Sequence, residues 1–150
     1  MLQFVFHNKT KAKISKSFLE KVAKQVIDIL KVKKNCEVGL FLVGEAKMKE
    51  LNKQYRKQNC VTDVLSFSQL ESKVPFIFPK IPTLSLGDVI VCYPQAKRQA
   101  KQYKHKVLTE VTILFIHGLL HLFGIDHDLG RDQAKKMMKI EKKVVKRLKF

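Results

Sequence analysis

The chain has 150 residues, of which 45% are hydrophobic and 29% charged, and its formal net charge is +17. This length and apolar content predict one globular domain, residues 1–150, and exclude a disordered chain. No apolar run reaches the roughly 18 residues of a membrane span, and the N-terminus does not resemble a signal peptide, so we expect a soluble cytoplasmic protein with no membrane partner.

Hydrophobic patterning predicts strands and helices that interleave along the chain. Short apolar or alternating runs predict four strands, at residues 2–6, 38–43, 61–67 and 86–92. Longer stretches with apolar residues at helical spacing predict five helices, at residues 17–30, 47–57, 94–104, 106–123 and 131–148. We therefore predict an α+β domain, a small mixed β-sheet surrounded by helices, in which the helix of residues 106–123 is central.

Local signals place several element ends. Ser17 and Glu20 have the spacing of a capping box and predict the start of the first helix. Pro94 suits the first turn of a helix, and Gly124 suits a helix end. The segment 69–82 contains three prolines and predicts an irregular loop or a pair of edge segments.

Three histidines have the spacing of a catalytic metal site. His117 and His121 are four residues apart, which places them one turn apart on one face of a helix. Gly124 permits a sharp turn, after which His127 can complete a third corner. Three imidazoles leave a fourth coordination position open for water, and they accept zinc, nickel, copper or cobalt. The alternative is a pair of histidines buried in the core; the two remaining histidines, His7 and His105, are interpreted as surface residues.

The reaction at such a site depends on the residue that follows the first histidine. The spacing resembles that of the metzincin peptidases and indicates a metalloprotease-like core, but those enzymes have a glutamate there as general base. Here the position is Gly118, which disfavours a peptidase. Glu110, two helical turns earlier, is a candidate to orient a metal ligand, or else a solvated carboxylate at the helix start. The general base is left open.

The segment HGLLHLFGIDH at residues 117–127 resembles the signature of the YbeY family of bacterial endoribonucleases. Two further segments are similar to the same family, in the same order. They are LNKQYR at residues 51–56, followed by TDVLSF at 62–67, and LGDVIV at 86–91. The chain departs from the family in the proline-rich segment 69–82 and at Ile125, where many relatives have an aromatic residue.

The resemblance implies a metal-dependent endoribonuclease specific for single-stranded RNA. It implies action on the 3′ end of small-subunit ribosomal RNA and in ribosome quality control, with the small ribosomal subunit as partner. It also implies one zinc ion held by His117, His121 and His127, and it matches the family's functional arginine to Arg56.

The chemistry of these residues agrees with that implication. A bound metal polarises a phosphoryl oxygen and lowers the pKa of its water to about 7. Arg56 can neutralise the charge of the transition state, or it can cap carbonyls or pair with Asp63. Asp126 is a candidate to fix a histidine tautomer or to cap the turn, and Asp63 and Asp88, placed at strand ends, are interpreted as structural. Ser66 is a candidate substrate contact, although such a hydroxyl usually binds backbone.

The basic surface favours a polyanionic partner. Lysine and arginine number 30 against 13 acidic residues, although a lysine-rich codon bias would also raise this number. The lysines of helices 94–104 and 131–148 are candidates for phosphate contacts that do not depend on the RNA sequence.

Two alternatives stay open beside the nuclease: an RNA-binding ribosome assembly factor whose metal is mainly structural, and a metallohydrolase of another substrate. Cys36, Cys60 and Cys92 are interpreted as reduced apolar residues.

Overall fold

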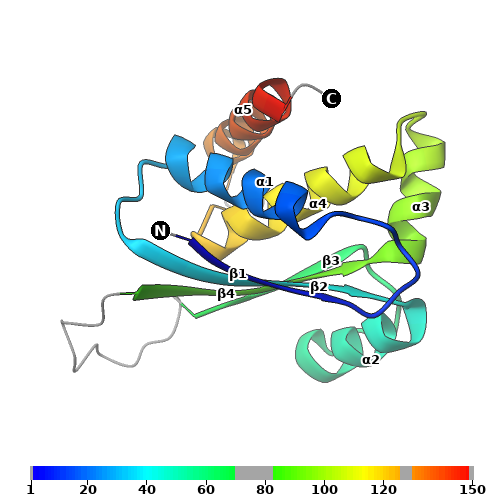
Figure 1. Ribbon diagram of the computed structural model, residues 1–150. Coiled ribbons are helices and arrows are strands. Elements are labelled where there is room, and N and C mark those ends of the chain that lie inside the picture. Colours follow the sequence, from blue (N-terminus) through cyan, green and yellow to red (C-terminus); the bar gives the residue numbers. More distant parts are fainter. Residues whose placement is uncertain (1, 70–82, 126–129, 149–150) are drawn as a thin grey trace.

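A computed structural model describes residues 2–69, 83–125 and 130–148 of the chain. Within these ranges four strands form one sheet, and five helices cover its two faces (Figure 1). The predicted α+β class, with a mixed sheet surrounded by helices, is confirmed. Within the same ranges, no helix combines the length and the apolar character that a membrane span requires.

The sheet is mixed, and its order differs from the order of the strands in the chain. Its strands are β1 (Leu2–Asn8), β2 (Asn35–Val43), β3 (Val64–Ser68) and β4 (Thr83–Cys92). The spatial order is β1-β2-β4-β3, with β1, β2 and β4 parallel and β3 antiparallel to β4. The short strand β3 is therefore an edge of the sheet.

The helices divide between the two faces of the sheet. They are α1 (Lys16–Ile29), α2 (Glu45–Arg56), α3 (Tyr93–Gln102), α4 (Val107–Leu122) and α5 (Arg131–Leu148). Figure 1 shows α1 and α4 above the sheet, with α5 stacked beyond them, and α2 alone below it. Helix α3 follows β4 directly and packs against α4.

Helix α4 is the centre of the core, as predicted. Its sequence is apolar on nearly every side, so it can be stable only where protein surrounds it. Ten of its sixteen residues are buried, and the ring of Phe115 packs 5.8 Å from that of Phe4 on β1. A Cβ atom at Gly118 would meet the side chain of Val89 and, at 3.1 Å, the hydroxyl of Ser66. Gly118 therefore allows α4 to lie directly on the sheet.

The start of α1 differs from the prediction. Ser15 is the N-cap, because its backbone is extended and its hydroxyl accepts a hydrogen bond of 3.3 Å from the N–H of Phe18. Ser17 lies inside the first turn, where its hydroxyl bonds that of Ser15 at 2.8 Å. The predicted capping box of Ser17 and Glu20 was therefore wrong. Both serines offer a capping hydroxyl, and the helix begins at the earlier one.

Two predictions about loops have different outcomes. Gly124 has φ +80° directly after α4, so the predicted turn residue is confirmed. Residues 70–82 lie outside the described part of the chain, and so does most of the predicted loop 69–82. Strand β4 begins at Thr83, three residues before the predicted start.

Candidate functional site

Two of the three predicted metal ligands lie on the last two turns of α4. His117 and His121 are one turn apart on a helix, and each is half-buried. The third, His127, lies outside the described residues, as does Asp126. Their roles stay predictions.

A glutamate from another helix reaches the first histidine. Oε1 of Glu141, on α5, contacts Nε2 of His117, and the Glu141 side chain is only 17% exposed. Glu141 follows the buried Ile140 on the side of α5 that faces the core. Sequence reasoning missed this residue. The signal available was weak: Glu141 is the one acidic residue of α5 beyond its first turn.

The donors in this region suit a zinc ion. Imidazole nitrogen and carboxylate oxygen are both common zinc ligands in proteins. Within residues 2–69, 83–125 and 130–148, no three His, Cys, Asp or Glu side chains are arranged to hold a metal ion. A complete ligand set therefore needs a further residue, for which the sequence predicts His127.

Strand β3 connects Arg56 to the histidine segment. Arg56 ends α2, and its Nη2 donates a hydrogen bond of 2.9 Å to the carbonyl of Ser66. The Ser66 hydroxyl donates in turn to the carbonyl of Gly118 at 3.1 Å, next to His117. Ser68 Oγ donates to the carbonyl of Leu122 at 2.9 Å, which fixes the strand along α4. Arg56 thus binds a carbonyl of β3 and not the carboxylate of Asp63, and the Ser66 hydroxyl binds backbone.

Glu110 does not contact His117 or His121, and it is not solvated. It is 3% exposed, and its two oxygens bind Gln99 Nε2 at 2.9 Å and His105 Nε2 at 2.5 Å. Both predicted roles for Glu110 were therefore wrong, and His105 is a partly buried partner rather than a surface residue. The reason is that α3 and the turn after it fold over the start of α4, which brings two polar side chains to the carboxylate.

Asp88 lies on the opposite face of the sheet from α4. It is in the middle of β4, opposite Gly39 of β2 and Phe67 of β3, and not at a strand end as predicted. A Cβ at Gly39 would collide with Asp88 Oδ1, so the glycine makes room for the carboxylate. Burial raises the pKa of Asp88, the nearby charge of Glu37 raises it further, and His7 lowers it.

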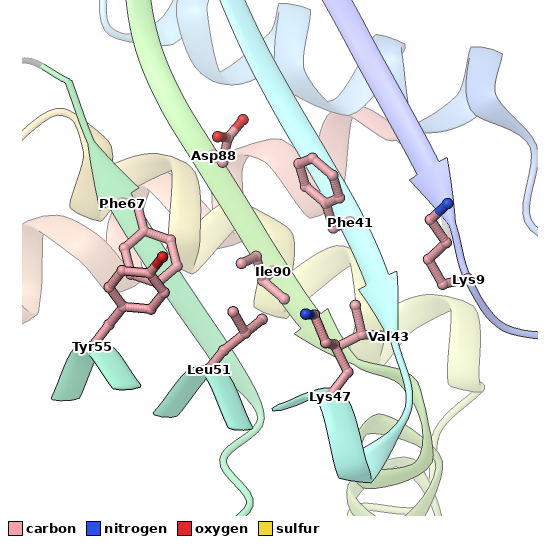
Figure 2. Close-up of a pocket in the computed structure, with 9 residues that line it drawn as sticks. All are labelled: Lys9, Phe41, Val43, Lys47, Leu51, Tyr55, Phe67, Asp88 and Ile90. Atoms are coloured by element: carbon pink, nitrogen blue, oxygen red, sulfur yellow. The ribbon is translucent and has the colours of Figure 1, made fainter. Parts of the chain in front are cut away.

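A pocket of about 720 Å³ opens on this second face, between the sheet and α2 (Figure 2). Most of its lining is apolar or aromatic. The lining residues are Lys9, Phe41, Val43, Lys47, Leu51, Tyr55, Phe67, Asp88 and Ile90. Sequence reasoning did not find the pocket, because its residues come from five separate elements or loops of the chain.

The predicted basic helices keep most of their positive charge at the surface. The exposed lysines of α5 are Lys135, Lys136, Lys139, Lys142, Lys143 and Lys146. On α3, Lys97 and Lys101 are exposed, whereas Arg98 is already paired with Glu45 at 2.5 Å. Because α5 also carries Glu141, the lysine-rich face belongs to the same helix that reaches His117.

Comparisons with known proteins agree on one family. Residues 5–149 match the family model described as endoribonuclease YbeY. Two proteins named endoribonuclease YbeY are similar over most of their length. That of Thermodesulfovibrio yellowstonii is 40% identical over 112 residues, which is 75% of this chain and 67% of the relative. That of Aquifex aeolicus is 37% identical over 138 residues, which is 92% and 87%.

A solved structure has the same fold. The solution structure of TM1509 from Thermotoga maritima superimposes with a TM-score of 0.63 and 28% sequence identity. The match covers 99% of this chain and 89% of the other. The fold of the described residues is therefore that of a protein already known from experiment.

Proposed function

The chain belongs to the YbeY family of endoribonucleases, and on that premise we propose that it cleaves single-stranded RNA at the histidine segment of α4. One observation supports this most: α4 carries His117 and His121, α5 brings Glu141 to His117, and β3 links Arg56 to the same helix. The substrate we propose is the 3′ end of small-subunit ribosomal RNA, in the cytoplasm, with a further role in ribosome quality control.

We propose that one zinc ion is held by His117, His121 and His127. When bound, such an ion polarises a phosphoryl oxygen and lowers the pKa of a water molecule to about 7. The two described histidines are half-buried, which limits competition from bulk water, and the Glu141 carboxylate beside His117 adds negative charge that favours a cation.

Arg56 is the residue we assign to the phosphate. Its guanidinium is always protonated and exposed to solvent, and the Ser66 carbonyl holds one of its nitrogens. Phe67 also supports it, since the ring centroid lies 5.9 Å from the guanidinium carbon. A guanidinium held in this way can donate to phosphate oxygens and neutralise the charge that develops during cleavage.

Glu141 supplies the carboxylate that Gly118 cannot. In a peptidase with this histidine spacing the base follows the first histidine, but here that position is glycine, and Val89 and Ser66 lie too close for a glutamate side chain. Glu141 approaches the same histidine from α5, with Oε1 at Nε2 of His117. We propose that its hydrogen bond with Nε2 orients the imidazole and leaves Nδ1 as the nitrogen that would hold an ion, and that the carboxylate accepts the proton given up by the attacking water during cleavage.

The lysines of α5 supply the sequence-independent part of RNA binding. Each contact of a lysine with a phosphate releases counterions, so the affinity should fall steeply with salt. Sequence preference then arises from the ribosomal context of the RNA or from contacts outside the lysine face.

The direct test is metal content combined with RNA cleavage. Purified protein is analysed for bound metal, and its cleavage of single-stranded RNA is measured with and without a chelator, beside the variants His117→Ala and Arg56→Ala. We expect about one zinc per chain and loss of cleavage with chelator or in either variant. Zinc bound without any RNA cleavage would refute the nuclease proposal.

The assembly-factor alternative has one observation in its favour. The +17 charge supports RNA binding whether or not the RNA is cut. If the wild type binds RNA and zinc but does not cleave, and if His117→Ala lowers only its stability, this alternative replaces the nuclease.

A further inference from the structure

The pocket between α2 and the sheet has walls suited to a flat aromatic ligand. Phe41, Ile90 and Phe67 rise from three neighbouring strands, and Leu51 and Tyr55 face them from α2 (Figure 2). The rings of Tyr55 and Phe67 lie edge to face with their centroids 5.0 Å apart. Pockets of several hundred Å³ with apolar walls and a few polar groups are the usual form of a ligand site.

The polar groups of the pocket carry both charges. Asp88 lies at the sheet, where Gly39 leaves space for its carboxylate, and Lys9 and Lys47 stand on the opposite side of the opening (Figure 2). A carboxylate accepts hydrogen bonds from amino and imino groups, and lysines attract phosphates. Aromatic walls, one half-buried carboxylate and two outer lysines together match a nucleotide whose base enters and whose phosphates stay outside.

The pocket and the histidine site share strand β3. Successive side chains of a strand point to opposite faces. Ser66 and Ser68 therefore bind α4 on one face, while Phe67 lines the pocket on the other. Arg56 stands at this edge of the sheet, one residue after Tyr55, with its guanidinium on the Ser66 carbonyl. A single strand of RNA that passes around the β3 edge would reach both sites.

We propose that this pocket binds one base of the same single-stranded RNA whose phosphate is cleaved at the histidines, a few nucleotides away along the strand. Guanine fits best, because its Watson–Crick edge presents two adjacent N–H donors to the Asp88 carboxylate. The site gives the enzyme a base preference that the lysine surface cannot supply. This inference rests on the proposed RNA cleavage.

The test compares two exposed tyrosines. Tyr55, in the pocket, is 56% exposed and Tyr103, outside it, is 59% exposed, so neither Tyr55→Ala nor Tyr103→Ala should unfold the protein. The probe is a short pyrimidine RNA with a single guanine, and its affinity is measured by fluorescence anisotropy with the full chain at about 0.2 M salt, where lysine contacts are weakened. We expect Tyr55→Ala to bind about tenfold more weakly than wild type and Tyr103→Ala to bind like wild type.

A second arm tests the carboxylate. Inosine in place of guanine lacks the amino group, so wild type should lose affinity for the inosine RNA, and Asp88→Asn should bind the two RNAs alike. If wild type cleaves RNA but Tyr55→Ala binds like Tyr103→Ala, the base pocket is refuted, and the pocket is left for another ligand such as a protein segment. If wild type neither binds nor cleaves the RNA, the proposed function itself fails, and the pocket inference fails with it.

Discussion

The face of the sheet that α4 covers is closed, whereas the face that α2 covers is open (Figure 1). Helix α4 buries ten of its sixteen residues, but α2 buries only Met48 and Asn52 of its twelve. Apolar side chains of α1, α4 and three strands fill the closed face, while the open face keeps a pocket of about 720 Å³. Most of the stability of the domain must therefore come from one face, which leaves the other available for binding.

His117 and His121 belong to the closed face, which explains how they are positioned. Because α4 is fixed on nearly all sides, its last two turns cannot rotate without disturbing the core. Arg56, by contrast, ends the more exposed α2, and its guanidinium donates a hydrogen bond to the Ser66 carbonyl of β3. This difference predicts that substitutions on the closed face mainly affect stability, whereas substitutions on the open face mainly affect RNA contact.

The largest expected effect is that of Phe115→Ala on the closed face. The side chain is fully buried, so its removal should lower the free energy of unfolding by about 3–5 kcal/mol. Leu51→Ala on the open face removes a half-buried side chain and should cost about 1 kcal/mol. Chemical denaturation of both variants measures the difference. Equal losses would contradict the division of the two faces.

Gly118→Ala tests how closely α4 lies on the sheet. The added methyl group would meet Val89 and Ser66, so we expect a loss of about 1–3 kcal/mol and weaker RNA cleavage as His117 shifts. Gly44→Ser is the matched control, because nothing lies within 4 Å of its Cβ and serine is a favoured N-cap. Chemical denaturation and RNA-cleavage assays of the two variants measure these losses. A Gly118→Ala protein as stable and active as wild type would show that the contact between α4 and the sheet has space for a methyl group at this position.

Glu110→Ala tests whether that carboxylate holds the closed face together or assists the metal. The substitution leaves Gln99 and His105 without their shared partner, so the free energy of unfolding should fall by about 1–3 kcal/mol. Zinc affinity, measured by competition with a chelating dye, should stay unchanged. Lower zinc affinity at unchanged stability would restore the role of orienting a metal ligand.

The smallest expected effect is that of Asp88→Asn on the open face. Because burial raises the pKa of Asp88, its ionised form costs stability at neutral pH, and asparagine removes that cost. The variant should therefore be slightly more stable near pH 7, and the advantage should fade as the pH falls and the aspartate becomes protonated in both states. Thermal unfolding between pH 7 and about pH 3 measures it. A variant that is less stable at pH 7 would mean that Asp88 supports the fold.

Local patterns in the sequence determine much of the fold and part of the site. The continuous apolar character of α4 predicts a central helix, and the spacing of His117 and His121 places them on one face of it. The choice between Ser15 and Ser17 as N-cap could not be made, because both carry the same hydroxyl close to the same helix start.

Contacts between distant segments could not be predicted. Glu141 reaches His117 only because α5 packs on α4 in one rotation, and nothing in the α5 sequence fixes that rotation toward the histidine. The pocket depends on the order β1-β2-β4-β3, which brings Phe41, Ile90 and Phe67 onto neighbouring strands. The hydrogen bond from Arg56 to Ser66 likewise depends on how the end of α2 lies against β3, which the local sequence does not specify.

We propose that the histidine segment of α4 cleaves single-stranded RNA with a bound metal ion. The most direct measurement is a zinc titration into metal-stripped protein, with cleavage of a single-stranded RNA followed at each step and Glu141→Gln and Lys142→Gln measured in parallel. We expect cleavage to appear as one equivalent of zinc binds, to be largely lost in Glu141→Gln, and to persist in Lys142→Gln. Full cleavage by the metal-stripped protein, or zinc binding with no cleavage, would contradict the claim.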